Sequence, residues 1–216
     1  MAFGKKKTDG CESTTVEIRP ANLQVIAVEI EGTAPYVQLK FSEKAKGSMA
    51  AKQMAGSTGK ASKAKAARSF EDDFRQAQHV SEEGWHGIPA TAFRAAMIDA
   101  CRTVGLEMTR AKMAVFVLAD GLDADDGTPL VRLDAPPPEM HVGAVRNATG
   151  VADLRARPMW RRWKATVTLR FDADILTAEN VVNLLSRAGQ QVGVGEGRPF
   201  SKKSVGQGWG TFEVIK

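Results

Sequence analysis

Cysteine is scarce in this chain of 216 residues, which contains only Cys11 and Cys101. Two distant cysteines form neither a disulfide framework nor a metal site with regular ligand spacing. Long apolar runs are also missing, since no stretch approaches the roughly 18 residues that span a membrane. The first residues are polar and basic and lack the apolar core of a signal peptide. We therefore expect a cytoplasmic protein with no membrane partner.

Histidine is sparse as well, with His79, His86 and His141. None has a second histidine or a cysteine at the spacing used by zinc sites, so we predict no metal and no cofactor. Residues 56–60 suggest a phosphate loop, but the first glycine and the final Ser or Thr of that motif are missing. The acidic residues 120–127 lack the ligand spacing of a calcium loop and are interpreted as a solvated hairpin turn. Nucleophile elbows and paired carboxylates are absent too, which favours a binding protein over an enzyme.

Positive charge is abundant, with a formal net charge of +5, and it is concentrated in two segments. Residues 43–68 and residues 146–164 each carry many basic side chains against a single acidic one. Such clusters are typical of contacts with nucleic-acid phosphates. Trp160 of the second cluster, or Trp209 near the C-terminus, would stack on a base, whereas Trp163 is expected in the core. The basic residues assigned to nucleic-acid binding here are Lys44, Lys46, Lys52, Lys60, Lys63, Lys65, Arg68, Arg146, Arg155, Arg157, Arg161 and Arg162.

Hydrophobic periodicity predicts strands and helices after a flexible N-terminal tail of residues 1–20. We expect helices between Pro89 and Gly105 and between Thr177 and Gly189. The order strand, helix, strand, strand, helix, strand is the split βαβ arrangement of ferredoxin-like and RNA-recognition folds. We therefore predict an α+β, RRM-like antiparallel sheet with two helices, forming one domain over residues 21–216. The expected strands lie near residues 23–30, 37–41, 113–118, 130–133, 163–171 and 212–214.

The first basic cluster, residues 43–68, has almost no apolar face despite its helix-favouring composition. A segment of this kind cannot bury itself, so we predict a flexible basic insertion that a partner orders.

Glycine dominates residues 193–210, which form the predicted C-terminal glycine-rich loop. Glycine permits positive φ, and successive exposed N–H groups can cradle a phosphate while nearby cations supply countercharge. A mobile hairpin whose glycines serve only for turning is the alternative interpretation. The loop residues assigned to nucleic-acid binding are Gly193, Gly195, Gly197, Arg198, Lys202, Lys203, Gly206 and Gly208.

Two motifs carry a family resemblance. Gly193-Val194-Gly195 is followed by a basic spacer and by Gly206-Gln207-Gly208 before the last strand, and residues 87–96 form a Gly-Ile-Pro turn that opens a helix. Both resemble motifs of the RAMP superfamily, the RNA-binding proteins of CRISPR effector complexes. The layout is most similar to the backbone subunit that polymerises along guide RNA, although a stand-alone relative from a phage or mobile element fits as well.

The resemblance implies an RRM-like fold, a ligand of RNA or single-stranded DNA bound partly by Arg94, and head-to-tail homo-oligomers. The leading hypothesis is therefore a non-catalytic single-stranded nucleic-acid binder. One alternative is a RAMP-type, metal-independent endoribonuclease with His86 as general acid and base. Another is a phage structural or assembly protein. RNA is the favoured ligand, although the sequence itself cannot choose RNA over DNA, because contacts to a 2′-hydroxyl have no residue signature.

Overall fold

The computed structural model describes residues 19–41, 69–146, 152–201 and 206–215, together with positions 47, 50 and 54. Within these residues the protein has antiparallel sheets and four α-helices, which confirms the predicted α+β class but doubles the expected number of helices. The predicted tail lies almost entirely outside the described residues. So does the predicted insertion, except for positions 47, 50 and 54, which are helical and exposed.

The larger sheet contains seven strands, all in antiparallel pairs. β9 pairs with β1 on one side and with β4 and β6 on the other. β10 adds to the end of β1, while β3 and β5 add to β6. Its strands are β1 (Leu23–Gly32), β3 (Gly87–Pro89), β4 (Val115–Leu118), β5 (Gly121–Leu122), β6 (Pro129–Asp134), β9 (Lys164–Asp172) and β10 (Phe212–Val214).

The alternation of apolar and polar residues along β9 explains its central place. Ala165, Val167, Leu169 and Phe171 are buried, whereas the residues between them point to the opposite face. Successive side chains of a strand face opposite sides, so this pattern gives the sheet one apolar face. The strand expected over residues 163–171 is thus confirmed to within one residue at each end.

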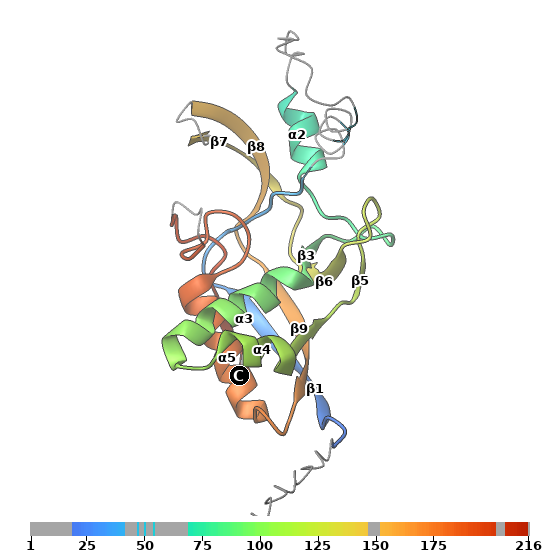
Figure 1. Ribbon diagram of the computed structural model, residues 1–216. Helices are drawn as coiled ribbons and strands as arrows, with labels where there is room; N and C mark the ends of the chain where they lie inside the picture. The colour runs from blue at the N-terminus through green and yellow to red at the C-terminus, as the bar shows by residue number, and fades with distance from the viewer. Residues whose placement is uncertain are drawn as a thin grey trace, which may run out of the picture.

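The apolar face of the sheet is covered by helices (Figure 1). Phe93, which belongs to the covering helix that comes first in the sequence, packs edge to face against Phe212 of β10, with ring centroids 5.7 Å apart. No helix among the described residues is both long and apolar enough to cross a bilayer. The covering helices are α3 (Ala90–Val104), α4 (Met108–Ala114) and α5 (Ala178–Arg187), which continues into the π-helical turn η1 (Ala188–Val192).

The expected end at Gly189 is wrong, because the helical turns continue to Val192 and the glycine with positive φ is Gly193, at 74°. Two other expected helix ends agree with the structure. Gly105 caps α3 with a φ of 69°, and the Thr177 hydroxyl accepts a hydrogen bond from the Asn180 N–H at the start of α5. Both are common devices for satisfying the unpaired backbone groups of a helix end.

The strand predicted over residues 113–118 starts late, because Met113 belongs to α4. This short helix was not predicted. Arg94 of α3 donates hydrogen bonds to the carbonyls of Lys112 and Val115 at the C-terminal end of α4. A contact from another helix therefore stabilises α4, and local periodicity does not reveal such contacts.

A second sheet projects from the body of the molecule, and it was not predicted (Figure 1). β8 forms a long hairpin with β7, and its last residues pair with β2. α2, also unpredicted, packs beside β8. The second basic cluster thus lies largely on an ordered hairpin. These elements are β2 (Tyr36–Val37), α2 (Phe70–Gln76), β7 (Glu139–Arg146) and β8 (Ala152–Trp160).

Candidate nucleic-acid interface

A cleft of about 960 Å³ lies between the β7–β8 hairpin, the glycine-rich loop and the start of α3. The three arginines that line it were predicted to bind nucleic acid from two segments about 40 residues apart in the sequence. The tertiary structure brings these two segments to one cavity. The acidic, basic and histidine side chains of its lining are His79, Arg155, Arg157, Glu196 and Arg198.

One wall of the cleft is the basic face of the hairpin. Arg155 and Arg157 are two residues apart on β8, so their side chains point to the same side of the hairpin. The Arg155 side chain keeps 35% of its surface exposed, and its Nε lies 3.2 Å from a carboxylate oxygen of Asp153. Arg157 is only 5% exposed and pairs with Glu196 of the opposite wall. Arg155 is therefore the more accessible cation, and Arg157 joins the two walls.

The opposite wall is the glycine-rich loop, which packs closely against neighbouring backbone. A Cβ on Gly195 would lie 2.5 Å from the Val37 carbonyl, and one on Gly210 would lie 1.8 Å from the Val194 carbonyl. Both glycines also have positive φ, at 77° and 67°. Only glycine fits such positions without a shift of the backbone.

Several N–H groups of this loop bind carbonyls of the protein itself. Val194 donates to Gly210, Glu196 to Val37 and Gly210 to Pro35. These donors are not available to a phosphate, so the predicted cradle of backbone N–H groups does not include them. Arg198, whose guanidinium donates to the Gly195 carbonyl, is the cation that this wall contributes to the cleft.

A second contact between the two walls comes from aromatic rings. Trp209 of the loop meets His141 of β7 edge to face, with ring centroids 5.3 Å apart. Trp209, considered above for base stacking, thus contacts the hairpin.

Four predicted binding residues lie elsewhere. Trp160 is 1% exposed and stacks on Tyr36 in the core, which leaves no free face for a base. Arg94 stabilises the end of α4, as described above, and stacks on Phe116. Arg161 is exposed and pairs with Glu139, and Arg162 is exposed. None of the four lines the cleft.

Other predicted residues fall outside the described part of the chain. The structure describes the backbone of Arg146 but not its side chain. The predicted residues that lie outside the description are Lys44, Lys46, Lys52, Lys60, Lys63, Lys65, Arg68, Lys202 and Lys203.

The predicted glycines of the loop are described. Gly193, Gly206 and Gly208 have positive φ, as does Gly197, which lines the cleft.

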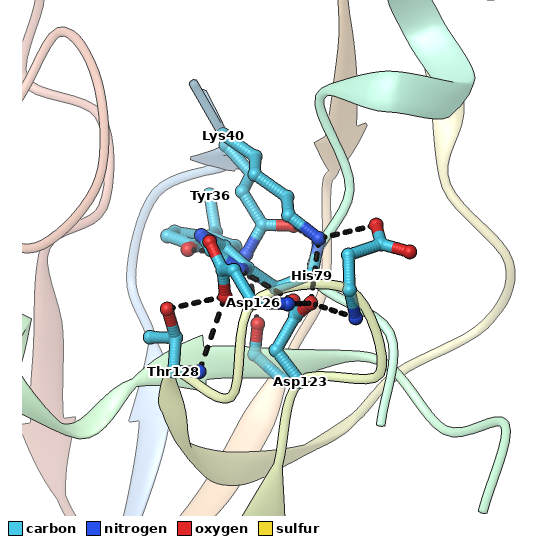
Figure 2. Close-up of polar contacts among 9 residues, drawn as sticks. Tyr36, Lys40, His79, Asp123, Asp126 and Thr128 are labelled. Carbon is cyan, nitrogen blue, oxygen red and sulfur yellow. Dashed lines mark hydrogen bonds and ion pairs between the residues drawn. The ribbon is translucent and has the colours of Figure 1, made fainter. Parts of the chain in front are cut away.

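A buried polar network lies beside the cleft (Figure 2). The Lys40 ammonium donates to carboxylate oxygens of Asp123 and Asp125, both at 2.6 Å. The other oxygen of Asp123 lies 2.7 Å from Nδ1 of His79. The Lys40 and Asp123 side chains are 3% and 0% exposed. This finding corrects the interpretation of residues 120–127 as a solvated turn, since Asp123 is buried there.

The network shifts the pKa values of Lys40, Asp123 and His79. Burial favours the neutral form of Lys40, but its hydrogen bonds to Asp123 and Asp125 outweigh this and raise the pKa of the ammonium. Burial likewise opposes ionisation of Asp123, yet its bonds from Lys40, from the Asp125 N–H and from His79 lower the pKa of the carboxyl. For His79 burial dominates over the attraction of Asp123 and lowers the pKa. At neutral pH the network therefore holds a charged lysine, a charged aspartate and a neutral histidine.

His79, Asp123 and Asp126 have ligand atoms within 4.8 Å of one another, a separation that a metal ion could bridge. The Lys40 ammonium, however, already supplies the positive charge at this position, and both oxygens of Asp123 have hydrogen-bond partners. Asp126 accepts hydrogen bonds from the N–H and hydroxyl of Thr128. His79, Asp123 and Asp126 thus fit a structural network of hydrogen bonds and ion pairs rather than a metal centre.

His86, the candidate general acid and base, does not line the cleft. Its Nε2 lies 2.9 Å from the side-chain oxygen of Gln78, and its ring meets Trp160 edge to face. Burial lowers the pKa of this imidazole. The histidine beside the cleft is His79, which sequence reasoning did not single out.

Sequence reasoning also missed Lys40 and Glu196. A lone lysine after an alternating apolar segment carries no signal for burial, because most lysines are exposed. The Asp-rich turn did contain a usable signal, since Asp123 accepts from the N–H groups of residues two and three positions later, a common aspartate turn.

Comparison with protein-family models and with curated proteins finds no match for this chain.

Replacing Lys40 with methionine tests the buried network. The change leaves Asp123 buried without its cation, so we expect the free energy of unfolding to fall by about 3–5 kcal/mol. Denaturant titration measures this loss. The matched control is Lys164→Met, which removes an exposed pair with Glu31 and should cost less than about 1 kcal/mol. Adding Asp123→Asn to Lys40→Met should recover part of the lost stability. Equal losses in Lys40→Met and Lys164→Met would contradict a stabilising buried ion pair.

The buried histidines predict a pH dependence of stability. His79 and His86 have pKa values below the ordinary 6.5, so the folded chain binds protons less readily than the unfolded chain. The free energy of unfolding should therefore decrease as the pH falls below about 6.5, and again in the acidic range where Asp123 becomes protonated. Denaturant titrations from pH 8 to pH 5 measure the slope. In His86→Gln this slope should be shallower, and a flat profile in the unmodified protein would contradict the assignment.

Proposed function

We propose that this protein binds single-stranded nucleic acid in the cleft between the β7–β8 hairpin and the glycine-rich loop. The observation that carries the proposal is that Arg155 and Arg198 face the same cavity from opposite walls. Cations on two sides of a groove can follow the phosphates of one strand. The volume of about 960 Å³ is at the upper end for ligand pockets and admits a nucleotide.

The apolar part of the cleft supports the same proposal. Pro89, Ala92 and Ala95 line it at the start of α3, and Leu39, which is half exposed, lines it as well. Small apolar side chains of this kind offer a surface for the faces of bases. With Trp160 buried, phosphate contacts should dominate the affinity. The ligand is thus a single strand, RNA or DNA, bound with little sequence preference.

The order of the strands supports a ferredoxin-like, RRM-like core. In the order β10-β1-β9-β4, helix α3 lies between β1 and β4 in the sequence and α5 lies between β9 and β10. This matches the split βαβ arrangement. Both RAMP-like motifs adjoin the cleft, through Pro89 and Gly195. We accordingly propose a RAMP-like origin and a non-catalytic role in which a bound strand is recovered intact.

Removing the cleft arginines tests the proposed function. Arg155→Ala and Arg198→Ala should each weaken binding of a fluorescent single strand by about tenfold and lower the salt slope by about one unit, since each removes a phosphate contact. Fluorescence anisotropy over a salt series measures both quantities. The matched control is Arg110→Ala, because Arg110 is exposed on α4 outside the cleft and carries the same charge.

Equal losses in all three variants would mean that binding depends on net charge and not on the cleft. No binding by the unmodified protein would overturn the proposal. Gel analysis of the same mixtures checks strand integrity, and cleavage would favour the endoribonuclease alternative.

We also propose that subunits assemble head to tail along the strand. A contact of this type need not close on itself, so it can propagate on a linear ligand. Native mass measurement on oligonucleotides of increasing length should show a stoichiometry that rises in steps. The Arg155→Ala, Arg198→Ala double variant serves as the control and should show fewer subunits at every length. A single subunit on every oligonucleotide would contradict the assembly.

A further inference from the structure

The strand β1 is paired unequally on its two sides. β9 pairs with it from Leu23 to Glu31, whereas β10 pairs only with Ile30–Gly32, and the Ile215 N–H adds one bond to the Glu29 carbonyl. Among the residues that the structure describes, no strand pairs with the outer edge of residues 23–28. Within the described part of the chain, more than half of β1 is therefore an open sheet edge.

The hydrogen bonds at both ends of β1 show which backbone groups this edge presents. Asn22 and Gly32 bond to the β9 side, whereas Glu29 and Thr33 bond to the β10 side. Backbone groups of an antiparallel strand alternate between its two neighbours. Odd-numbered residues therefore direct their N–H and C=O groups away from β9, and between 23 and 28 these are Leu23, Val25 and Ala27.

The same residues expose apolar side chains on the face opposite the helices. Leu23 and Val25 are 51% and 56% exposed. Residues 23–28 contain no charge and no proline. Natural sheet edges are usually protected by a lysine, a proline, a bulge or a covering segment. This edge has neither charge nor proline, so it is suited to pair with another strand.

We infer that the partner is a second copy of this chain, with the two β1 edges paired antiparallel about a two-fold axis. Centring the pair on Val25 places Leu23 opposite Ala27 of the second copy. Every outward N–H and C=O of the three residues then finds a partner, because the outward positions are odd-numbered on both strands. The exposed Leu23 and Val25 gain apolar neighbours, and no charge opposes the contact. A two-fold contact of this kind is self-complementary.

The dimer leaves the cleft open. The N-terminal end of β1 lies at the opposite end of the molecule from the β7–β8 hairpin (Figure 1). The inference is independent of the proposed nucleic-acid binding, and its test uses protein freed of nucleic acid.

Sedimentation velocity over a concentration series of the full chain tests the dimer. Ala27→Pro removes an outward N–H without removing a bond to β9, and the preceding residue is already extended. Val25→Lys places a charge at the centre of the contact. Each variant should raise the dimer dissociation constant at least about tenfold, because several hydrogen bonds or buried apolar groups are lost together. Met113→Lys adds the same charge at an exposed site on α4 and should leave the constant unchanged.

Circular dichroism and the melting temperature at low concentration show whether the variants are folded. If Ala27→Pro unfolds, Val25→Lys keeps the test valid, since its side chain is exposed. If the unmodified protein is monomeric at every concentration, the inference is overturned. The same result is expected if another segment of the chain covers this edge. A dimer that survives both substitutions would overturn it as well.

Discussion

The buried ion pair between Lys40 and Asp123 fixes the segment on which both walls of the cleft depend. Lys40 lies at the end of the stretch that begins at Pro35, and its ammonium ties this stretch to the turn at residues 120–128. A buried charge without its partner is strongly unfavourable, so neither side can move away alone. The segment is held further by Gln38, whose side chain donates to the Gly87 carbonyl and accepts from the His79 N–H.

From this segment the two walls are built by backbone hydrogen bonds. β2 pairs with the end of β8, which sets the position of the hairpin. The carbonyls of Pro35 and Val37 accept from Gly210 and Glu196, which sets the position of the glycine-rich loop. Arg157 and Glu196 then join hairpin to loop. The polar network therefore supports the cleft, and Arg155 and Arg198 line it from opposite walls, where the proposed ligand would bind.

The two surfaces proposed here have different physical bases. The cleft depends on charge, so its affinity should respond to salt. The edge of β1 depends on unpaired backbone groups and on exposed apolar side chains, which salt affects little. Because they lie at opposite ends of the molecule, a dimer through β1 would present two clefts to nucleic acid. The two contacts can therefore be altered separately by substitution.

The sequence by itself determined the elements whose pattern is local. β9 and α5 were predicted because alternation with period two and a stripe at three- and four-residue spacing are properties of neighbouring residues. The positive φ of Gly195 and the accumulation of cations near Arg155 were also predictable, since each follows from residue type.

Only the tertiary structure decided the features that join distant parts of the chain. Lys40 and Asp123 are 83 residues apart, and nothing near either residue indicates the partner that makes its burial possible. Trp160 was assigned to a base because it lies among arginines, but packing against Tyr36 places it in the core. The pairing of β1 is likewise decided by the strands that meet it, since among the described residues β10 pairs only with Ile30–Gly32, and residues 23–28 carry no signal of this. Contacts of this kind depend on which elements meet in space, and the periodicity of a single segment carries no information about them.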